Sequence, residues 1–410
     1  MQSASHIVVD GQAARDRLRI VVLGYIVRGP LGGMAWHHLQ YVVGLSELGY
    51  DVMFLEDSDD YPCCYDPARH VTDDDPTYGL AFATRAFREV GIPERWAYYD
   101  AHRNRWHGPF ADHAFPFCRS ADVVLNLSGV NPLRDWLHEI PLRVLIDTDP
   151  GFSQIRHLQD PDARSRSEKH NRFFTFGENY GRPFCTVPDD GFPWQPTRQP
   201  MCLRCWPMTP GPALGPFTTV MQWDSYPPRE FQGVRYGMKS HSFQPYAQLP
   251  RASETPFELA VGSLSAPRDA LQTNGWHVRD PLAVSRDLWS YQQYLQASKA
   301  EFSVAKQGYV MTRCGWFSER SAAYLASGRP VLVQDTGFRE WLPATMGIVS
   351  FASPDEALDG ITRINRDYRL HCHAARSIAA QYFDARHVLT NLIERTMAGA
   401  DGVTKTQAEP

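Results

Sequence analysis

The 410-residue sequence predicts an α/β protein with two Rossmann-like, doubly wound domains that face an interdomain cleft. Three observations support this prediction. Short apolar runs that fit buried strands alternate with helical stretches along most of the chain. The length suits two domains better than one hydrophobic core. A segment rich in proline and glycine, residues 181–216, interrupts the alternation near the middle of the chain.

The expected domain boundaries follow from these changes in pattern. Residues 1–16 and 400–410 are polar and aperiodic, which is typical of mobile tails. We expect an N-terminal α/β domain over residues 17–180 and a Pro/Gly-rich connector over residues 181–216. A C-terminal α/β domain should cover residues 217–399, and its last helix could cross back to the N-terminal domain.

The N-terminal domain is expected to open with a β-loop-α-β unit. A buried strand at 19–24 leads through the glycine-rich loop 29–33 into a helix that Gly49 closes before the next strand. The remaining β-branched and aromatic runs predict strands at 52–55, 122–127, 143–146 and 172–176.

The second half repeats the alternation of strands and helices. Apolar runs predict strands at 217–221, 257–261, 275–278, 301–305 and 330–333. Helical periodicity predicts helices near 285–298, 318–327, 354–365 and 371–381.

The composition is that of an ordinary enzyme. Basic residues number 41 against 46 acidic ones, the formal net charge is −5, and 43% of the residues are hydrophobic. This balance gives no electrostatic footprint for nucleic acid or an anionic membrane surface. No apolar run is long enough for a membrane span. Eight cysteines are too few for a secreted disulfide scaffold and no leader pattern is evident, so we expect a cytoplasmic protein.

Residues 318–338, SERSAAYLASGRPVLVQDTGF, are the most informative segment. Ser318 is a suitable N-cap, Gly328 a helix stop, and Pro330 prevents the helix from continuing. A buried strand and a polar loop follow. In open α/β sheets, ligands bind beyond the carboxyl ends of strands, where helix amino termini present N–H groups to anions. The segment therefore predicts a phosphate site at the Ser318 helix and the loop 336–338.

These residues carry a resemblance. Residues 318–338 resemble the donor-binding half of glycosyltransferases of the GT-B architecture. The run Arg313-Cys314-Gly315-Trp316-Phe317-Ser318 is similar to the His-Cys-Gly-Trp-Asn-Ser start of the plant-type donor signature, with Arg and Phe replacing His and Asn. The run GGMAWHHLQYVVGLSELGYDVMFLED is similar to the GT-B opening. The resemblance implies that the C-terminal domain, 217–399, is the donor-binding domain and holds a nucleotide-sugar diphosphate. It also implies that the N-terminal domain, 17–180, is the acceptor side.

Candidate donor residues surround the predicted phosphate site. Lys306 ends a predicted strand, and Arg313 and Arg320 flank the helix start. An arginine in the first turn is unfavourable unless an anion is present, although Arg320 could instead pair with Glu319 or Glu340. Lys306 and Arg313 could equally be solvated surface charges, and Ser318 only an N-cap. The full predicted set is Gly32, Gly33, Lys306, Arg313, Ser318, Glu319, Arg320, Thr336, Gly337, Phe338 and Glu340, with Lys239 a weaker candidate.

Two groups compete as general base for an acceptor hydroxyl. His37 and His38 lie one turn into the first helix, and imidazole titrates near neutrality. Asp147 and Asp149 follow a strand at the carboxyl edge of the sheet. Either group could instead satisfy local structural partners. The run Asp147-Thr148-Asp149 matches the Asp-x-Asp metal motif of GT-A glycosyltransferases, but it lies in the acceptor half of the chain. We therefore expect metal-independent transfer and no cofactor.

The sequence thus predicts a glycosyltransferase that moves a sugar from a nucleotide-diphosphate sugar to a hydroxyl of a small-molecule or glycan acceptor. We expect these two substrates to be its partners, and we expect no nucleic-acid partner. A nucleotide-sugar epimerase on the same fold remains an alternative. So does a degenerate, non-catalytic sugar- or nucleotide-binding module, because Ala323 stands where many such enzymes have a ribose-binding Glu. Glu319 or Glu340 could replace that residue.

Overall fold

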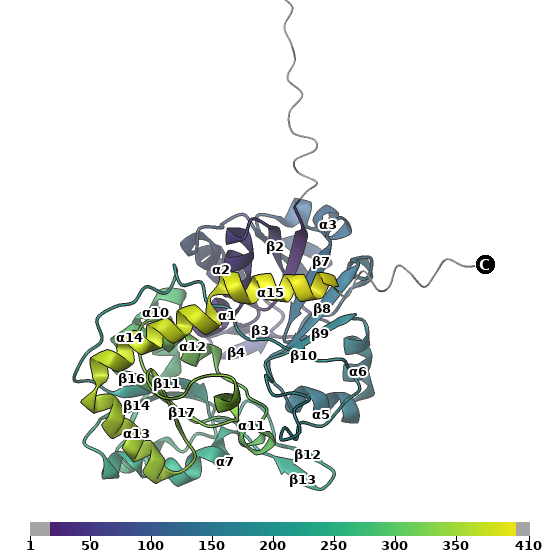
Figure 1. The fold of residues 1–410 in the computed structure, drawn as a ribbon. Coiled ribbons are helices and arrows are strands. Elements are labelled where there is room, and N and C mark those ends of the chain that lie inside the picture. Colours follow the sequence, from purple (N-terminus) through teal and green to yellow (C-terminus); the bar gives the residue numbers. More distant parts are fainter. Residues whose placement is uncertain (1–16, 399–410) are drawn as a thin grey trace, which may run out of the picture.

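The computed structural model describes residues 17–398, which form two α/β lobes, each built on its own sheet (Figure 1). The tails predicted at 1–16 and 400–410 lie outside the described residues. We call the part built on the first sheet the N-terminal lobe and the part built on the second sheet the C-terminal lobe. The predicted fold class, two doubly wound α/β units, is confirmed.

The sheet of the N-terminal lobe has eight strands in the order β10-β9-β8-β7-β1-β2-β5-β6. All neighbours are parallel except β5 and β6. The strands are β1 (Arg19–Leu23), β2 (Asp51–Asp57), β5 (Trp96–Asp100), β6 (Arg105–His107), β7 (Val123–Leu127), β8 (Leu142–Asp147), β9 (Arg172–Thr175) and β10 (Gln195–Pro196). A separate antiparallel ribbon pairs β3 (Cys64–Asp66) with β4 (Val71–Asp73).

Both faces of this sheet are covered by helices. The side chains of β1 alternate between two cores, with Ile20 and Val22 in one and Val21 and Leu23 in the other. This double burial explains why the strand is apolar throughout. The helices of the lobe are α1 (Gly32–Glu47), α2 (Thr77–Glu89), α3 (Ala111–Arg119), α4 (Asp135–His138), α5 (Phe152–Gln159) and α6 (Pro161–Glu168).

The sheet of the C-terminal lobe has six parallel strands in the order β15-β14-β11-β16-β17-β18. They are β11 (Phe217–Gln222), β14 (Phe257–Gly262), β15 (His277–Arg279), β16 (Ala300–Ser303), β17 (Val331–Gln334) and β18 (Ile348–Phe351). An aromatic core holds the lobe together, in which Phe302 stacks on Phe351 with ring centroids 5.3 Å apart.

Helices and short turns connect these strands. The α-helices are α7 (Lys239–Phe243), α8 (Arg268–Thr273), α9 (Pro281–Ser285), α10 (Leu288–Ala297), α11 (Gln307–Thr312), α12 (Glu319–Ala326), α13 (Pro354–Arg366) and α14 (Tyr368–Ile378). The shorter elements are the hairpin β12 (Arg229–Phe231) and β13 (Val234–Tyr236), the 3-10 turns η2 (Gln244–Tyr246), η3 (Leu249–Ala252) and η4 (Phe338–Glu340), and the π-helical turn η5 (Ala379–Phe383).

The last described helix, α15 (Ala385–Ala398), lies on the N-terminal lobe beside α1 (Figure 1). Gly44 of α1 permits the contact, because a Cβ atom there would lie 2.5 Å from Leu389 and 2.9 Å from Ala385. The Arg172 side chain also donates to the carbonyl of Thr396 across 3.2 Å. Within residues 17–398, no helix has both the length and the apolar character needed to span a bilayer.

The segment 181–216 is more than the connector that its composition predicts. It supplies β10, which extends the first sheet beside β9. Trp206 is fully buried and its ring centroid lies 5.1 Å from that of Trp36 on α1. Arg329, also fully buried, donates to the carbonyl of Thr209 across 2.8 Å. The segment therefore packs against both lobes along its course.

Candidate active site

A cavity of about 240 Å³ lies between the lobes, where the strands of both sheets end. Parallel strands end at one edge of their sheet, so loops after several strands reach this space together. The N-terminal lobe contributes Tyr25, Met34, His37, Ser128, Thr148 and Asp149, and the C-terminal lobe contributes Ser225, Lys239, Lys306, Tyr309, Trp316, Ser318, Glu319 and Arg320. Six of the predicted site residues are among these.

Helix α12 begins at this cavity. The hydroxyl of Ser318 accepts a hydrogen bond from the backbone N–H of Arg320 across 3.2 Å, so Ser318 is the N-cap and also lines the cavity. Glu319 follows and is half-buried, with no ion-pair partner among the described residues. The amino end of the helix, with its partial positive charge, thus faces the space between the lobes.

Arg320 lines the cavity, but its guanidinium is committed to the interior of the C-terminal lobe. It donates to Glu301 across 2.7 Å, to Ser303 across 2.6 Å and to the carbonyl of Val220 across 2.8 Å. The expectation that an external anion would balance Arg320 is corrected, because the buried carboxylate of Glu301 does so. The alternative partners, Glu319 and Glu340, are not bonded to it.

Lys306 is likewise engaged within the protein. Its ammonium lies 2.8 Å from Oδ1 and 3.0 Å from Oδ2 of Asp149, on the opposite lobe, and donates to the hydroxyl of Tyr226 across 2.8 Å. The hydroxyls of Tyr226 and Tyr309 also donate to Asp149. The predicted base Asp149 therefore accepts from three side chains at once.

Lys239, which the sequence ranked below the other cations, is the lysine without a protein counter-ion at this cavity. It is half-buried at the start of α7, and no ion pair joins it to the described residues. Burial first, and then the nearby charges of Arg320 and Lys306, lower the pKa of Lys239 to about 7. Only its position in the folded chain reveals this role, because the run Tyr236-Gly237-Met238-Lys239 has no distinctive spacing.

The two histidines of α1 lie in different environments. His37 lines the cavity, and burial lowers its pKa, so the imidazole is neutral at pH 7. His38 is fully buried, hydrogen-bonds through Nδ1 to the carbonyl of Met34 across 2.8 Å, and packs on Tyr25. The placement of His38 at the cleft is therefore corrected: the sheet-facing side of α1 lies in the core.

Asp147 also has a structural position. It is 3% exposed and accepts hydrogen bonds from Ser153, Gln154, Thr175 and the backbone of Asp149. These bonds fix the loop between β8 and α5. The expectation that Asp147 acts as general base is corrected, because both of its carboxylate oxygens already accept hydrogen bonds from protein groups.

The turn at residues 26–28, which precedes the glycine-rich loop 29–33, offers no free N–H groups to a phosphate. The backbone N–H groups of Ile26, Val27 and Arg28 all donate to the buried carboxylate of Glu56, at 2.6 to 2.7 Å. Arg28 adds an ion pair to the same carboxylate at 3.3 Å. Three converging N–H groups form an anion-binding nest, and here the protein's own glutamate fills it.

Gly32 and Gly33 serve instead in packing between the lobes. A Cβ atom on Gly32 would lie 2.2 Å from the carbonyl oxygen of Asp287, and one on Gly33 would lie 3.0 Å from the ring of Tyr291. Their lack of side chains lets α1 approach α10 of the other lobe. The predicted role of both glycines in phosphate binding is corrected accordingly.

The remaining predicted donor residues lie beside the cavity rather than in its lining. Exposed Arg313 pairs with exposed Glu340 across 3.1 Å. Thr336 donates to the carbonyl of Trp316 across 2.5 Å, and the carbonyl of Gly337 accepts from Asn179. Phe338 is buried against Phe317. The loop 336–338 thus buttresses the segment before α12.

Comparisons with known proteins agree with this architecture. No protein-family model matches the chain, and neither does any curated protein. Among solved structures, an alpha-glucosyltransferase (AGT) in complex with UDP superimposes with a TM-score of 0.57 at 8% identity, covering 93% of this chain and 100% of that chain. An alpha-glucosyltransferase in complex with UDP and a 13-mer DNA containing a HMU base gives 0.56 at 9% identity, with the same coverage. Sucrose-phosphate synthase from Thermosynechococcus elongatus gives 0.51 at 11% identity, covering 94% of this chain and 100% of that chain.

These likenesses extend over both lobes and define the fold. The chain has the GT-B architecture found in these glycosyltransferases, as the resemblance of residues 318–338 implies. At such low identity, the comparison supports the arrangement of the lobes and not a particular substrate.

Proposed function

We propose that this protein is a glycosyltransferase that moves a sugar from a nucleotide-diphosphate sugar to a hydroxyl of a small-molecule or glycan acceptor. The observation that carries the proposal is the position of Lys239, which has no ion-pair partner within residues 17–398, at the cavity where α12 begins between two GT-B lobes. The UDP complexes of the similar alpha-glucosyltransferases support it.

The C-terminal lobe would bind the donor. A leaving diphosphate develops negative charge, which preorganised cations and helix amino termini stabilise in a site that excludes water. Lys239 would supply the unpaired charge and α12 the dipole. Lys306, whose ammonium already makes three hydrogen bonds to Asp149 and Tyr226, would have to exchange one of them to contact the diphosphate. Glu319, half-buried beside them, is placed to accept hydrogen bonds from hydroxyl groups of the donor.

His37 would act as the general base for the acceptor hydroxyl. It belongs to the N-terminal lobe, lines the cavity opposite Lys239, and is neutral at pH 7 because burial lowers its pKa. A neutral imidazole can accept a proton, whereas Asp149 already accepts from Lys306 and two tyrosines. Asp149 would therefore orient Lys306 rather than deprotonate the acceptor.

Transfer is proposed to be metal-independent. The oxygens of Asp147 and Asp149 that would have to bind a divalent cation already accept hydrogen bonds from protein groups. Unchanged turnover after treatment with excess chelator is the expected result. Turnover that is lost with chelator and restored by manganese would contradict this part of the proposal.

A nucleotide panel tests the proposal as a whole. We expect UDP, GDP, ADP or TDP to raise the melting temperature of the purified protein, and the matching nucleotide sugar to be consumed only when an acceptor is present. No stabilisation by any of them would overturn the proposal. Epimerisation of the donor without acceptor would identify an epimerase, and binding without turnover would identify a non-catalytic module.

A further inference from the structure

A second and larger cavity, of about 620 Å³, lies within the N-terminal lobe. Its walls come from the loops after β2 and β7, from the end of β8 and from α5 and α6. Ser128 lines both this cavity and the interdomain cavity, so the two spaces meet at its side chain. The hydroxyl of Ser128 is hydrogen-bonded to that of Thr148 across 2.7 Å, which fixes the junction.

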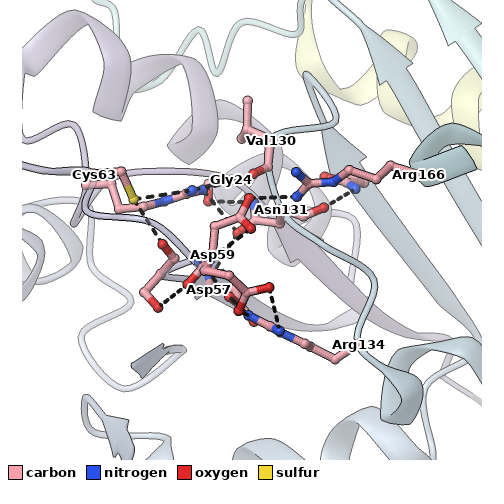
Figure 2. A network of polar contacts seen from close by, with 12 residues as sticks. Gly24, Asp57, Asp59, Cys63, Val130, Asn131, Arg134 and Arg166 are labelled. Atoms are coloured by element: carbon pink, nitrogen blue, oxygen red, sulfur yellow. Dashed lines mark hydrogen bonds and ion pairs between the residues drawn. The ribbon is translucent and has the colours of Figure 1, made fainter. Parts of the chain in front are cut away.

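The charges around the larger cavity cancel. Its lining contains four arginine or lysine side chains and four aspartates. Arg134 forms a two-pronged pair with Asp57 at 2.9 Å and also bonds Asp60, while Arg166 lies 2.6 Å from Asp59 (Figure 2). Because these cations are already neutralised, an anionic ligand would gain little from them.

The interdomain cavity differs in this respect. Lys306 there is paired with Asp149 and Arg320 with the buried Glu301, whereas no ion pair joins Lys239 to the described residues. This unpaired amine suits a diphosphate, whereas the balanced lining of the larger cavity suits a neutral ligand. The two spaces are therefore chemically distinct although they share Ser128.

The larger cavity combines fixed polar groups with aromatic rings. The ion pairs leave N–H groups and carboxylate lone pairs for further hydrogen bonds, since Arg166 bonds Asp59 through one of its nitrogens. Tyr61 is 53% exposed, Trp136 is half-buried, and both line the cavity. Sugar rings present hydroxyls at their edges and C–H groups on their faces, which matches such a lining.

We propose that the 620 Å³ cavity binds an uncharged sugar unit as the acceptor, with the reacting hydroxyl directed past Ser128 toward the donor. The role of the bound sugar as acceptor rests on the proposed function. Binding of the sugar to this cavity does not require a bound nucleotide. It excludes sugar phosphates and apolar aglycones as the preferred occupants.

Binding without donor tests the site directly. Saturation-transfer NMR with the full-length protein would use methyl glucoside, methyl galactoside, maltose and cellobiose as probes, with glucose 6-phosphate and p-cresol as charged and apolar counterparts. We expect at least one neutral sugar to bind, and Tyr61→Ala and Arg156→Gln each to weaken it by fivefold or more. Both side chains are more than half exposed, so their removal leaves the fold intact.

Matched measurements separate this inference from the proposed function. Arg366→Gln removes another exposed arginine that is paired with a neighbouring aspartate, and should leave sugar binding unchanged. UDP-induced stabilisation should be the same in Tyr61→Ala as in the unaltered protein. Nucleotide binding without binding of any neutral sugar, tighter binding of glucose 6-phosphate or p-cresol, or sugar binding that neither substitution weakens would overturn the sugar site alone. Sugar binding without nucleotide binding would instead overturn the proposed transferase and leave the site standing.

Discussion

Lys306 and Asp149 join the two lobes across the candidate active site, with the ammonium 2.8 Å from one carboxylate oxygen and 3.0 Å from the other. The hydroxyls of Tyr226 and Tyr309 bond the same carboxylate. The pair is mostly shielded from solvent, at 12% and 28% side-chain exposure. It therefore holds the lobes together and leaves Lys239 as the cation available to a ligand.

Asp149→Asn should weaken this contact between lobes. The amide cannot accept from Lys306 as an anion does, and loss of charge-assisted bonds costs about 1 to 3 kcal/mol. We expect the free energy of unfolding in urea to fall by that amount. Asp367→Asn, which breaks the exposed pair with Arg366, should change it by less than about 0.5 kcal/mol. Equal effects of the two substitutions would contradict the bridging role of Asp149.

Lys239→Met should selectively weaken nucleotide binding. The substitution keeps the length of the side chain and removes the unpaired charge. A charge-assisted hydrogen bond contributes about 1.5 to 3 kcal/mol, so affinity for the nucleoside diphosphate should fall by about tenfold to a hundredfold in calorimetric titration. Lys169→Met, at an exposed lysine of the N-terminal lobe, is the control. An unchanged affinity in Lys239→Met would remove the main support for the donor site.

The pKa of Lys239 predicts how binding depends on pH. Burial first, and then Arg320 and Lys306, lower it from 10.5 to about 7, while Glu319 and Glu301 act in the opposite direction. Above about pH 7 the free protein holds the amine neutral, so a bound diphosphate must draw a proton onto it, and affinity should fall by up to about tenfold per pH unit.

Two measurements check this dependence. Calorimetry in buffers of different ionisation enthalpy, between about pH 7 and about pH 9, should show uptake of up to about one proton. In the protein without ligand the sign is opposite: the cost of the charged amine is fully present below about pH 7 and fades as the pH rises toward 10.5, so stability should rise over that window. Lys239→Met should abolish both effects, and proton uptake that persists in this variant would assign the effect to another group.

The backbone of the proposed donor site could be predicted from local sequence. Ser318 caps α12 and Gly328 ends it, and the predicted strand 330–333 corresponds to β17 at Val331–Gln334. These elements follow from residue preferences that act within a few positions. β5, the run Trp-Ala-Tyr-Tyr-Asp at Trp96–Asp100, is not among the predicted strands, although its aromatic residues are typical of a strand and could have revealed it.

The side-chain partners could not be predicted in this way. Arg320 pairs with Glu301 and Glu56 fills the loop at residues 26–28, and in each case the partners lie about 20 to 30 positions apart in sequence. The spacing of residues in the sequence predicts side-chain partners only within one helix or one hairpin. Lys239 can contact a ligand because the neighbouring carboxylates bond other groups. Only the folded structure shows these pairings.

Arg320→Met should therefore lower the stability of the fold more than it lowers the affinity for a ligand. The substitution leaves the fully buried carboxylate of Glu301 without its counter-ion, which typically costs about 3 to 5 kcal/mol. Urea denaturation should show this loss. The double variant Arg320→Met, Glu301→Gln should recover part of it, since the orphaned charge is removed. If the Arg320→Met protein were stable but bound nucleotide poorly, Arg320 would instead be a donor-binding residue.

The two neighbouring histidines of α1 give a test of the base. His37→Gln should lower kcat by about a hundredfold to ten-thousandfold, because a positioned base is lost, and should leave UDP-induced stabilisation unchanged. His38→Gln should instead lower the melting temperature, because His38 is fully buried against Tyr25 and bonded to Met34. The pKa of His37 is lowered by burial, so its base form persists in acid and the acid limb of kcat/KM should lie below pH 6.5. An acid limb above that value, or full turnover in His37→Gln, would show that another group takes the proton.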